Sequence, residues 1–161
     1  MTQPPTIRPP SIVSGPVRVL DANDVGSLAE GNYHGDYAIL FKESESVLTE
    51  DVVARFYPTL VGPDDAFEVV IARGTTVCTF VVRFHPTSGF VPIDFTVDLG
   101  AEILGETDLS GNVELRHPAV GYAESSPIGH TDFLHFDGSS LSARLSDKAG
   151  RIDEARIFIA C

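Results

Sequence analysis

The chain has 161 residues, with 23 acidic against 11 basic side chains and a formal net charge of −12. This charge repels phosphate backbones and anionic membrane surfaces, which disfavours direct nucleic-acid binding and leaves nucleic acid only as an indirect partner. No apolar run is long enough to cross a bilayer, and the N-terminus lacks the basic and apolar regions of a signal peptide. We therefore expect a single domain made in a cytoplasm.

The N-terminal segment is rich in proline. Residues 1–16 contain five prolines and show no apolar periodicity. This composition favours an extended, polyproline-like arm that either dangles or lies on a neighbour. We predict such an arm over residues 1–16 and one β-sandwich domain over residues 17–161.

After the arm, the apolar residues recur with a period of two. In TTVCTFVVRF, the even-numbered positions from Thr76 to Phe84 form an apolar stripe, and in FVPIDFTVDL the odd-numbered positions from Val91 to Leu99 do so. Each pattern predicts a β-strand with one face buried. The preceding run, AFEVVIA, also alternates, and Arg73-Gly74 joins it to the first stripe as a tight turn would. Residues 66–85 are therefore predicted to form one β-hairpin.

Clusters of Gly, Asp, Asn and Ser separate the other predicted strands. These strands are at 15–21, 35–42, 112–120, 132–136, 140–146 and 151–160. Residues 48–56 fit a helix capped by Thr49 and a strand equally well. About nine short strands without strand–helix alternation indicate an all-β fold, an antiparallel β-sandwich. We expect a jelly roll of about eight strands, although patterning does not separate it from an up-and-down barrel.

The pattern Arg-Phe-x-Pro-Thr occurs twice, at 55–59 and at 83–87. In each copy the apolar alternation stops at the aromatic residue, because proline cannot donate to the sheet ladder and fixes its own φ. Both copies are predicted strand ends. Arg55 and Arg83 should lie on the faces opposite Phe56 and Phe84, exposed or paired with an acidic neighbour. Equivalent rims of two sheets would explain the repetition.

The first copy also carries a family resemblance. The run ARFYPTLVGP resembles a segment in the coat proteins of tymoviruses and other small icosahedral plant viruses, where a strand ends in a His-Pro-Thr-like triplet and a small residue with proline follows. The stretch FYPTLVGPDDAFEVV resembles a strand junction in the small coat proteins of plant satellite viruses. Tyr57 stands where the family has histidine, whereas His85 occupies that place in the second copy. The resemblance, centred on Arg55 to Val70, implies a jelly roll whose subunits close into an icosahedral shell. It also implies that a basic arm is unnecessary, since tymovirus-like coats lack one.

The best catalytic constellation is GHTDFLHFDG, with His130, Asp132, His135 and Asp137. Residues two apart in a strand share a face, so each His-x-Asp pair could orient an imidazole as a general base or supply two metal ligands. The two pairs would face opposite sides and could not form one site. In the alternative interpretation, His130 and Asp132 precede the strand, and His135 lies beside Phe133 on a partly buried face. No nucleophile accompanies His130 and Asp132, so the sequence favours a protein without a catalytic site.

The remaining acidic and sulfur side chains suggest no cofactor. Four acidic residues lie near the strand at 91–99 and the turn after it: Asp94, Asp98, Glu106 and Asp108. They lack the ordered spacing of a calcium loop and are predicted to form a solvated acidic face. Cys78 lies in an apolar run and Cys161 is the last residue, which predicts a small buried hydrophobe and an incidental thiol. No phosphate-binding or zinc motif is found, so we predict neither a cofactor nor a metal site.

Three functions remain open from the sequence. The first is a structural protein, a self-assembling viral coat subunit whose partner is itself and whose location is the virion. The second is a small β-barrel enzyme or binding protein for a small hydrophobic molecule, with His130 and Asp132 at its mouth. The third is a decoration or tail protein of a bacteriophage. The coat-subunit hypothesis accounts for the largest number of features: the β pattern, the arm, the resemblance and the missing catalytic set.

Overall fold

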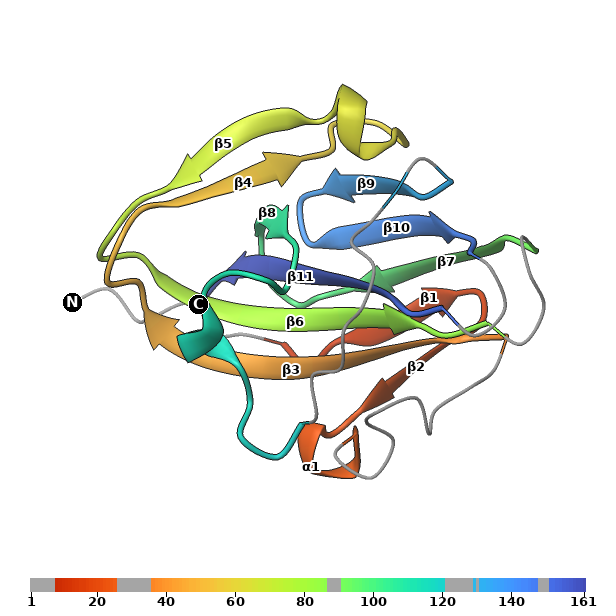
Figure 1. Ribbon diagram of the computed structural model, residues 1–161, viewed down its shortest axis with the longest axis horizontal. Coiled ribbons are helices and arrows are strands. Elements are labelled where there is room, and N and C mark those ends of the chain that lie inside the picture. Colours follow the sequence, from red (N-terminus) through yellow and green to blue (C-terminus); the bar gives the residue numbers. More distant parts are fainter. Residues whose placement is uncertain (1–7, 26–35, 87–90, 121–128, 130, 148–150) are drawn as a thin grey trace.

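The computed structural model describes residues 8–25, 36–86, 91–120, 129, 131–147 and 151–161. These residues form two β-sheets that pack against each other, as Figure 1 shows. The predicted all-β sandwich is therefore confirmed. Within the described ranges, no helix has the length and hydropathy needed to cross a bilayer.

The small sheet has the strand order β1-β7-β10-β9. Its strands are β1 (Ser11–Ser14), β7 (Ile93–Asp98), β9 (Phe133–Asp137) and β10 (Ser140–Leu145). The large sheet has the order β2-β3-β6-β11-β8-β4-β5. Its strands are β2 (Val17–Leu20), β3 (Ala38–Val47), β4 (Val52–Phe56), β5 (Phe67–Ile71), β6 (Thr76–Phe84), β8 (Ile103–Thr107) and β11 (Asp153–Ala160).

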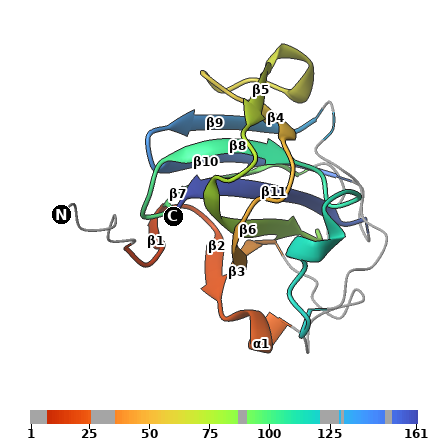
Figure 2. The same ribbon diagram turned by 90° about the vertical axis from the view of Figure 1, so that its left-hand side faces the viewer.

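Short helical turns join some of these strands. They are α1 (Ala22–Val25) and the 3₁₀ turns η2 (Pro63–Asp65) and η3 (Val113–Leu115). All strand pairs are antiparallel except β2 with β3, which run parallel. Figures 1 and 2 show α1 and β5 at opposite ends of the molecule.

The main core lies between the sheets and is built from the predicted apolar stripes. On β7, Phe95 and Val97 point inward and are buried, while Asp94 on the other face of the strand is exposed. On β6, the even-numbered residues from Cys78 to Phe84 face the same core. Period-two alternation therefore predicted the inward faces of both strands, because one face of each is buried against the opposite sheet.

The large sheet is buried on its outer face as well. There Val81 of β6 packs in a cluster with Val25 of α1, and Val77 packs with Leu115 of η3 and Phe158 of β11. Strands that are covered on both sides carry apolar residues at successive positions. This double burial explains why the segments of β6 and β11 are so rich in apolar residues.

The predicted hairpin over 66–85 is wrong. A turn does form, with the amide of Thr75 donating to the carbonyl of Ala72 (3.1 Å) and Gly74 at φ +88°. Beyond the turn the strands part, since β5 pairs with β4 whereas β6 pairs with β3 and β11. Leu48, between β3 and β4, exchanges backbone hydrogen bonds with Gly74 and Thr75 (both 2.9 Å). The chain therefore forms one long bent ribbon, with β3 and β4 along one side and β5 and β6 along the other.

Four other segments can be compared with the predicted elements. Residues 112–120 are not a strand, because Asn112 adopts left-handed φ (52°), a 3₁₀ turn follows and Pro118 cannot donate. Strand β8 was missed, and its Gly105 packs so closely on β4 that an added Cβ would lie 2.8 Å from Cβ of Ala54. Residues 48–56, which fitted a helix or a strand, contain strand β4. Within the predicted arm, β1 pairs with β7 at the edge of the small sheet.

Both Arg-Phe-x-Pro-Thr copies end strands, as predicted: β4 ends at Phe56 and β6 at Phe84. Their placement at the rims of two sheets is wrong, because β4 and β6 both belong to the large sheet. The second copy lies in the middle of that sheet, between β3 and β11.

The prediction for the cysteines is only half right. Cys78 is fully buried, but Cys161 forms a disulfide with it, with the two Cα atoms 5.5 Å apart. The cause is the antiparallel register of β6 and β11, which sets Ile159 directly opposite Cys78 and brings Cys161 beside it. No local sequence pattern predicts the disulfide between Cys78 and Cys161.

Candidate functional site

The predicted His130–Asp132 pair is described only in part. His130 lies outside the described residues. Asp132 is 1% exposed, and its two carboxylate oxygens accept backbone hydrogen bonds from Gly129 (2.9 Å) and Ser146 (3.0 Å). His135 is half-buried beside Phe133 on β9, as the alternative interpretation predicted, and Asp137 is exposed. Asp132 is therefore a buried group that fastens two backbone segments.

The side chain of Asp132 lies beside that of Asp153, the first residue of β11. Asp153 is 2% exposed, and its Oδ2 has no hydrogen-bond partner among the described residues. Burial raises the pKa of Asp132 to about 6, against the lowering effect of the amides of Gly129 and Ser146. Burial, a hydrogen bond with Asp147 and the charge of Asp132 raise the pKa of Asp153 to about 10, although Arg151 opposes the rise. The Asp132–Asp153 pair therefore holds a proton at neutral pH.

A carboxylic acid that stays protonated at neutral pH can donate a hydrogen bond or a proton. Here both carboxyl groups are almost completely buried, and Asp132 is bonded to the backbone. The pair consequently supports a role in the stability of the fold, where its protonation state sets the free energy of unfolding. Asp153 was not predicted from the sequence, because Asp132 precedes a strand of the small sheet and Asp153 begins a strand of the large sheet, so only the packing of the two sheets brings them together.

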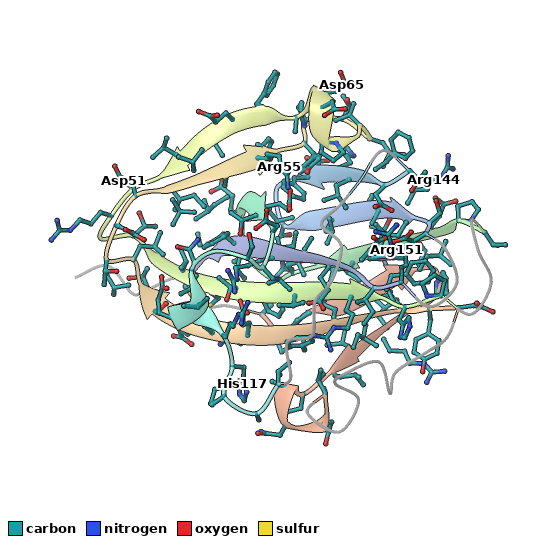
Figure 3. The ribbon with its side chains drawn as sticks, in the orientation of Figure 1. Asp51, Arg55, Asp65, His117, Arg144 and Arg151 are labelled. Atoms are coloured by element: carbon teal, nitrogen blue, oxygen red, sulfur yellow. A yellow bond between two sulfur atoms is a disulfide. The ribbon has the colours of Figure 1, made fainter. Side chains whose placement is uncertain are left out.

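The first Arg-Phe-x-Pro-Thr copy holds a buried glutamate. Arg55 lies directly opposite Glu106 of β8 and donates to both of its carboxylate oxygens, from Nε to Oε1 (2.9 Å) and from NH2 to Oε2 (3.1 Å). Tyr57 donates its hydroxyl to Oε1 (2.6 Å). Figure 3 shows Arg55 on β4, on the side of the strand that faces β8. The arginine and the variable residue of the motif therefore both donate hydrogen bonds to the carboxylate of Glu106.

Glu106 corrects the expectation of a solvated acidic face. Its exposed fraction is 0%, while Asp94 remains exposed and pairs with Arg144 at the surface. Burial raises the pKa of Glu106, whereas the charge and hydrogen bonds of Arg55 lower it. Burial and the nearby Glu106 also raise the pKa of Tyr57, so its hydroxyl remains a donor at neutral pH. An open groove of about 450 Å³ borders this cluster.

Tyr57→Phe is expected to lower the free energy of unfolding by about 1.5–3 kcal/mol, since it removes a hydrogen bond to a buried charged group. Urea unfolding of the variant measures this loss. In the background of Glu106→Gln, the same substitution should have a smaller effect, because the acceptor is then neutral. An equal loss in both backgrounds would show that the hydroxyl acts elsewhere.

The second copy repeats this pairing in the centre of the sheet. Arg83 lies directly opposite Glu154 of β11, with Nε 3.2 Å from Oε1, and both side chains are almost fully buried. The prediction that each arginine of the motif is exposed or paired with an acidic neighbour is confirmed. Each one faces a glutamate across a strand pair, which is the arrangement that stabilises opposite charges in sheets.

A further buried ion pair lies on the outer face of the large sheet. Arg156 of β11 donates from Nε and NH2 to the two carboxylate oxygens of Glu43 (2.6 and 2.9 Å), and the exposed fraction of each side chain is 0%. Thr79 donates to Oε1 of Glu43 (3.0 Å), and NH1 of Arg156 donates to the carbonyl of Gly111 (2.8 Å). The ion pair therefore links β11 to β3 across β6. Through its hydrogen bond to Gly111, Arg156 also anchors the segment that contains this glycine.

These ionic clusters link strands of the fold to one another. Among the described residues, the carboxylates of Glu43 and Glu106 bond to arginines on other strands, and none of the clusters described above includes a nucleophile beside a base. The predicted general base, His130, is outside the described residues. Comparisons with protein-family models, with curated proteins and with solved structures find no match to this chain.

Proposed function

We propose that the chain is a structural subunit that assembles with copies of itself, as the jelly-roll coat proteins of icosahedral shells do. The observation that carries the proposal is the apolar edge of the large sheet. The buried ionic clusters support it indirectly, because they serve the fold and leave no catalytic set among the residues described.

The apolar edge is formed by β4 and β5. Val53 and Val70 lie directly opposite each other and are each 60% exposed, so they form one continuous apolar contact surface. Phe67, on the other face of β5, is 61% exposed. An edge strand offers unpaired backbone donors and acceptors to any chain that approaches it. An edge with large apolar residues on both faces suits an interface with another subunit.

The small sheet has a comparable edge at β1. All four residues of this strand are exposed, including Ile12 (49%) and Val13 (64%). Each sheet therefore ends, within the described chain, in a strand with exposed apolar side chains. Two separate contact surfaces on one subunit are the requirement for an assembly that grows beyond a dimer.

Charge would regulate this assembly. Asp65 and Glu68 are exposed beside the apolar edge of β5, within a chain of net charge −12. Subunits that bring such edges together also bring carboxylates together, which costs free energy until protons or divalent cations neutralise them. Association should therefore be favoured by mildly acidic pH and by divalent cations.

The test is the particle mass in solution, measured by light scattering after size exclusion at neutral and mildly acidic pH, with and without Ca²⁺. We expect uniform closed particles in negative-stain images of the void fraction. Val70→Lys should abolish them, because it places a charge in the apolar edge without disturbing the core. Val91→Lys is the matched control, since Val91 is equally exposed (58%) but precedes β7 in the small sheet.

A small species under every condition would contradict shell formation. A uniform trimer would instead favour the decoration protein of a bacteriophage. Loss of particles in both lysine variants would mean that added charge, and not the β4–β5 edge, controls the association.

A further inference from the structure

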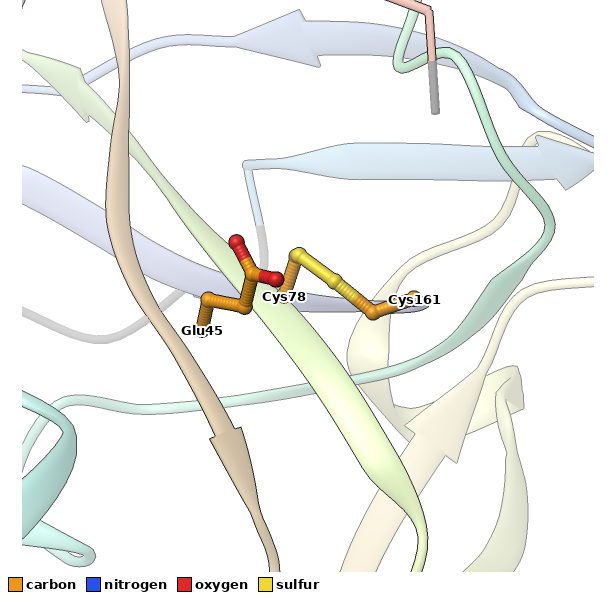
Figure 4. Close-up of side chains that lie close together, drawn as sticks. All are labelled: Glu45, Cys78 and Cys161. Carbon is orange, nitrogen blue, oxygen red and sulfur yellow. A yellow bond between two sulfur atoms is a disulfide. The ribbon is translucent and has the colours of Figure 1, made fainter. Parts of the chain in front are cut away.

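Three side chains with metal-ligating atoms lie together on the inward face of the large sheet. The ligand atoms of Glu45, Cys78 and Cys161 all lie within 4.8 Å of one another. Figure 4 shows the three side chains close together. They come from neighbouring strands: Glu45 of β3 is directly opposite Cys78 of β6. Cys161 follows β11, and its amide donates to the carbonyl of Thr76 on β6 (3.3 Å). The sheet itself therefore fixes the spacing of the three groups.

The cluster is open to solvent on the side of Glu45. Cys78 is buried, Cys161 is half-buried and Glu45 is exposed. Glu45 also lines an open groove of about 400 Å³, together with Lys42. The ammonium of Lys42 donates to Oε2 of Glu45 (2.9 Å), a contact of the kind that orients ligating carboxylates in metal sites. The exposed Glu45 and the half-buried Cys161 are therefore the members of the cluster that an ion from solvent would meet first, and water can occupy a fourth position.

The oxidation state of the two cysteines determines whether they form a disulfide or bind a metal ion as thiolates. In the structure they are joined as a disulfide. A phosphine reductant and water convert this disulfide into two thiols and a phosphine oxide, with two electrons passing from phosphorus to the sulfur atoms. A divalent ion then displaces the two thiol protons and binds both thiolates. Two thiolates, one carboxylate and one water form a tetrahedral set of the kind that Zn²⁺ accepts.

We propose that the reduced protein binds one thiophilic divalent cation, of the class of Zn²⁺, through Cys78, Cys161 and Glu45. The disulfide and the metal are then alternative links between β6 and the end of β11. The metal link adds β3 as a third strand, through Glu45. No zinc site was expected from the sequence, because zinc motifs are closely spaced cysteine and histidine ligands, whereas this set is assembled by strand register.

The test uses Co²⁺ as a spectroscopic probe on the full chain. The protein is reduced with a phosphine, freed of reductant without air, assayed for free thiols and titrated with Co²⁺. We expect thiolate-to-cobalt charge-transfer absorption that saturates at equimolar metal and disappears on addition of Zn²⁺. The oxidised protein should show no such absorption. Circular dichroism confirms that the reduced protein remains folded during the titration.

Variants assign the ligands. Cys161→Ser should lose most of the charge-transfer intensity, and Glu45→Gln should keep both thiolates but bind the metal about tenfold or more weakly. Glu114→Gln is the matched control, because Glu114 is also exposed but belongs to η3. The proposal is overturned if the folded, reduced protein with free thiols gives no cobalt–thiolate absorption, or if Cys161→Ser or Glu45→Gln binds cobalt as the unmodified protein does.

Discussion

Arg156→Met is expected to lower the free energy of unfolding by about 3–5 kcal/mol, because it leaves the buried carboxylate of Glu43 without its counter-ion. Both side chains have an exposed fraction of 0%, and two short hydrogen bonds join them. For a chain of this size the melting temperature should fall by roughly 10 °C. Urea unfolding and thermal melting, followed by circular dichroism, measure the two quantities.

Arg144→Met is the matched control for this experiment. Arg144 makes the same type of paired contact with Asp94, but the side chains are 49% and 62% exposed. Water and salt screen such a surface pair, so its loss should leave the unfolding curve almost unchanged. Adding Glu43→Gln to Arg156→Met should recover part of the lost stability, because no buried charge then remains unpaired. Equal effects of Arg156→Met and Arg144→Met would contradict the importance of burial.

Asp153→Asn is expected to raise the stability at pH 8 and to change it little near pH 4. The pKa of Asp153 is raised to about 10 and that of Asp132 to about 6, in both cases mainly by burial. A carboxyl group with a raised pKa in the folded state contributes its full stability below its unfolded pKa, about 4, and loses it as the pH rises through the folded pKa. The free energy of unfolding should therefore fall between about pH 4 and about pH 10.

The neutral amide that Asp153→Asn introduces removes most of that fall. The gain at pH 8 should reach several kcal/mol, at about 1.4 kcal/mol for each unit of pKa. Other charged groups beside Asp153 are Asp147 and Arg151, and both remain in the variant. Chemical unfolding across this pH range gives the measurement, and Asp137→Asn, on the exposed end of β9, is the control. A parallel pH profile for Asp153→Asn and the unmodified protein would show that the Asp132–Asp153 pair does not control the pH dependence.

The parts of the fold that could be predicted from the sequence are those with a local cause. Phe95 and Val97 alternate with polar residues because one face of β7 meets the core, and this alternation is visible in the chain. The ends of β4 and β6 follow from the proline after each motif, which removes a backbone donor. The inward faces of β6 and β7 and the ends of β4 and β6 could therefore be predicted.

The parts that failed depend on which strands become neighbours. The turn at Gly74 forms as predicted, but β5 pairs with β4, and β6 pairs with β3 and β11. Leu48, which lies between β3 and β4, makes backbone hydrogen bonds to this turn. Both the disulfide and the Asp132–Asp153 pair join segments far apart in the chain. One signal was present: β11 carries three charged residues near its start, within an otherwise apolar strand. Charges on both faces of such a strand indicate buried partners on both sides of its sheet.

The position of β11 constrains the order in which the molecule can form. This strand is the last in chain order, yet it lies between β6 and β8, with Ala160 opposite Val77. The large sheet cannot grow strand by strand along the chain, since its middle is completed after the segments on both sides exist. Contacts between such distant segments make folding slow. Until β11 inserts, the inner edges of β6 and β8 remain open, and partly folded chains can aggregate through them.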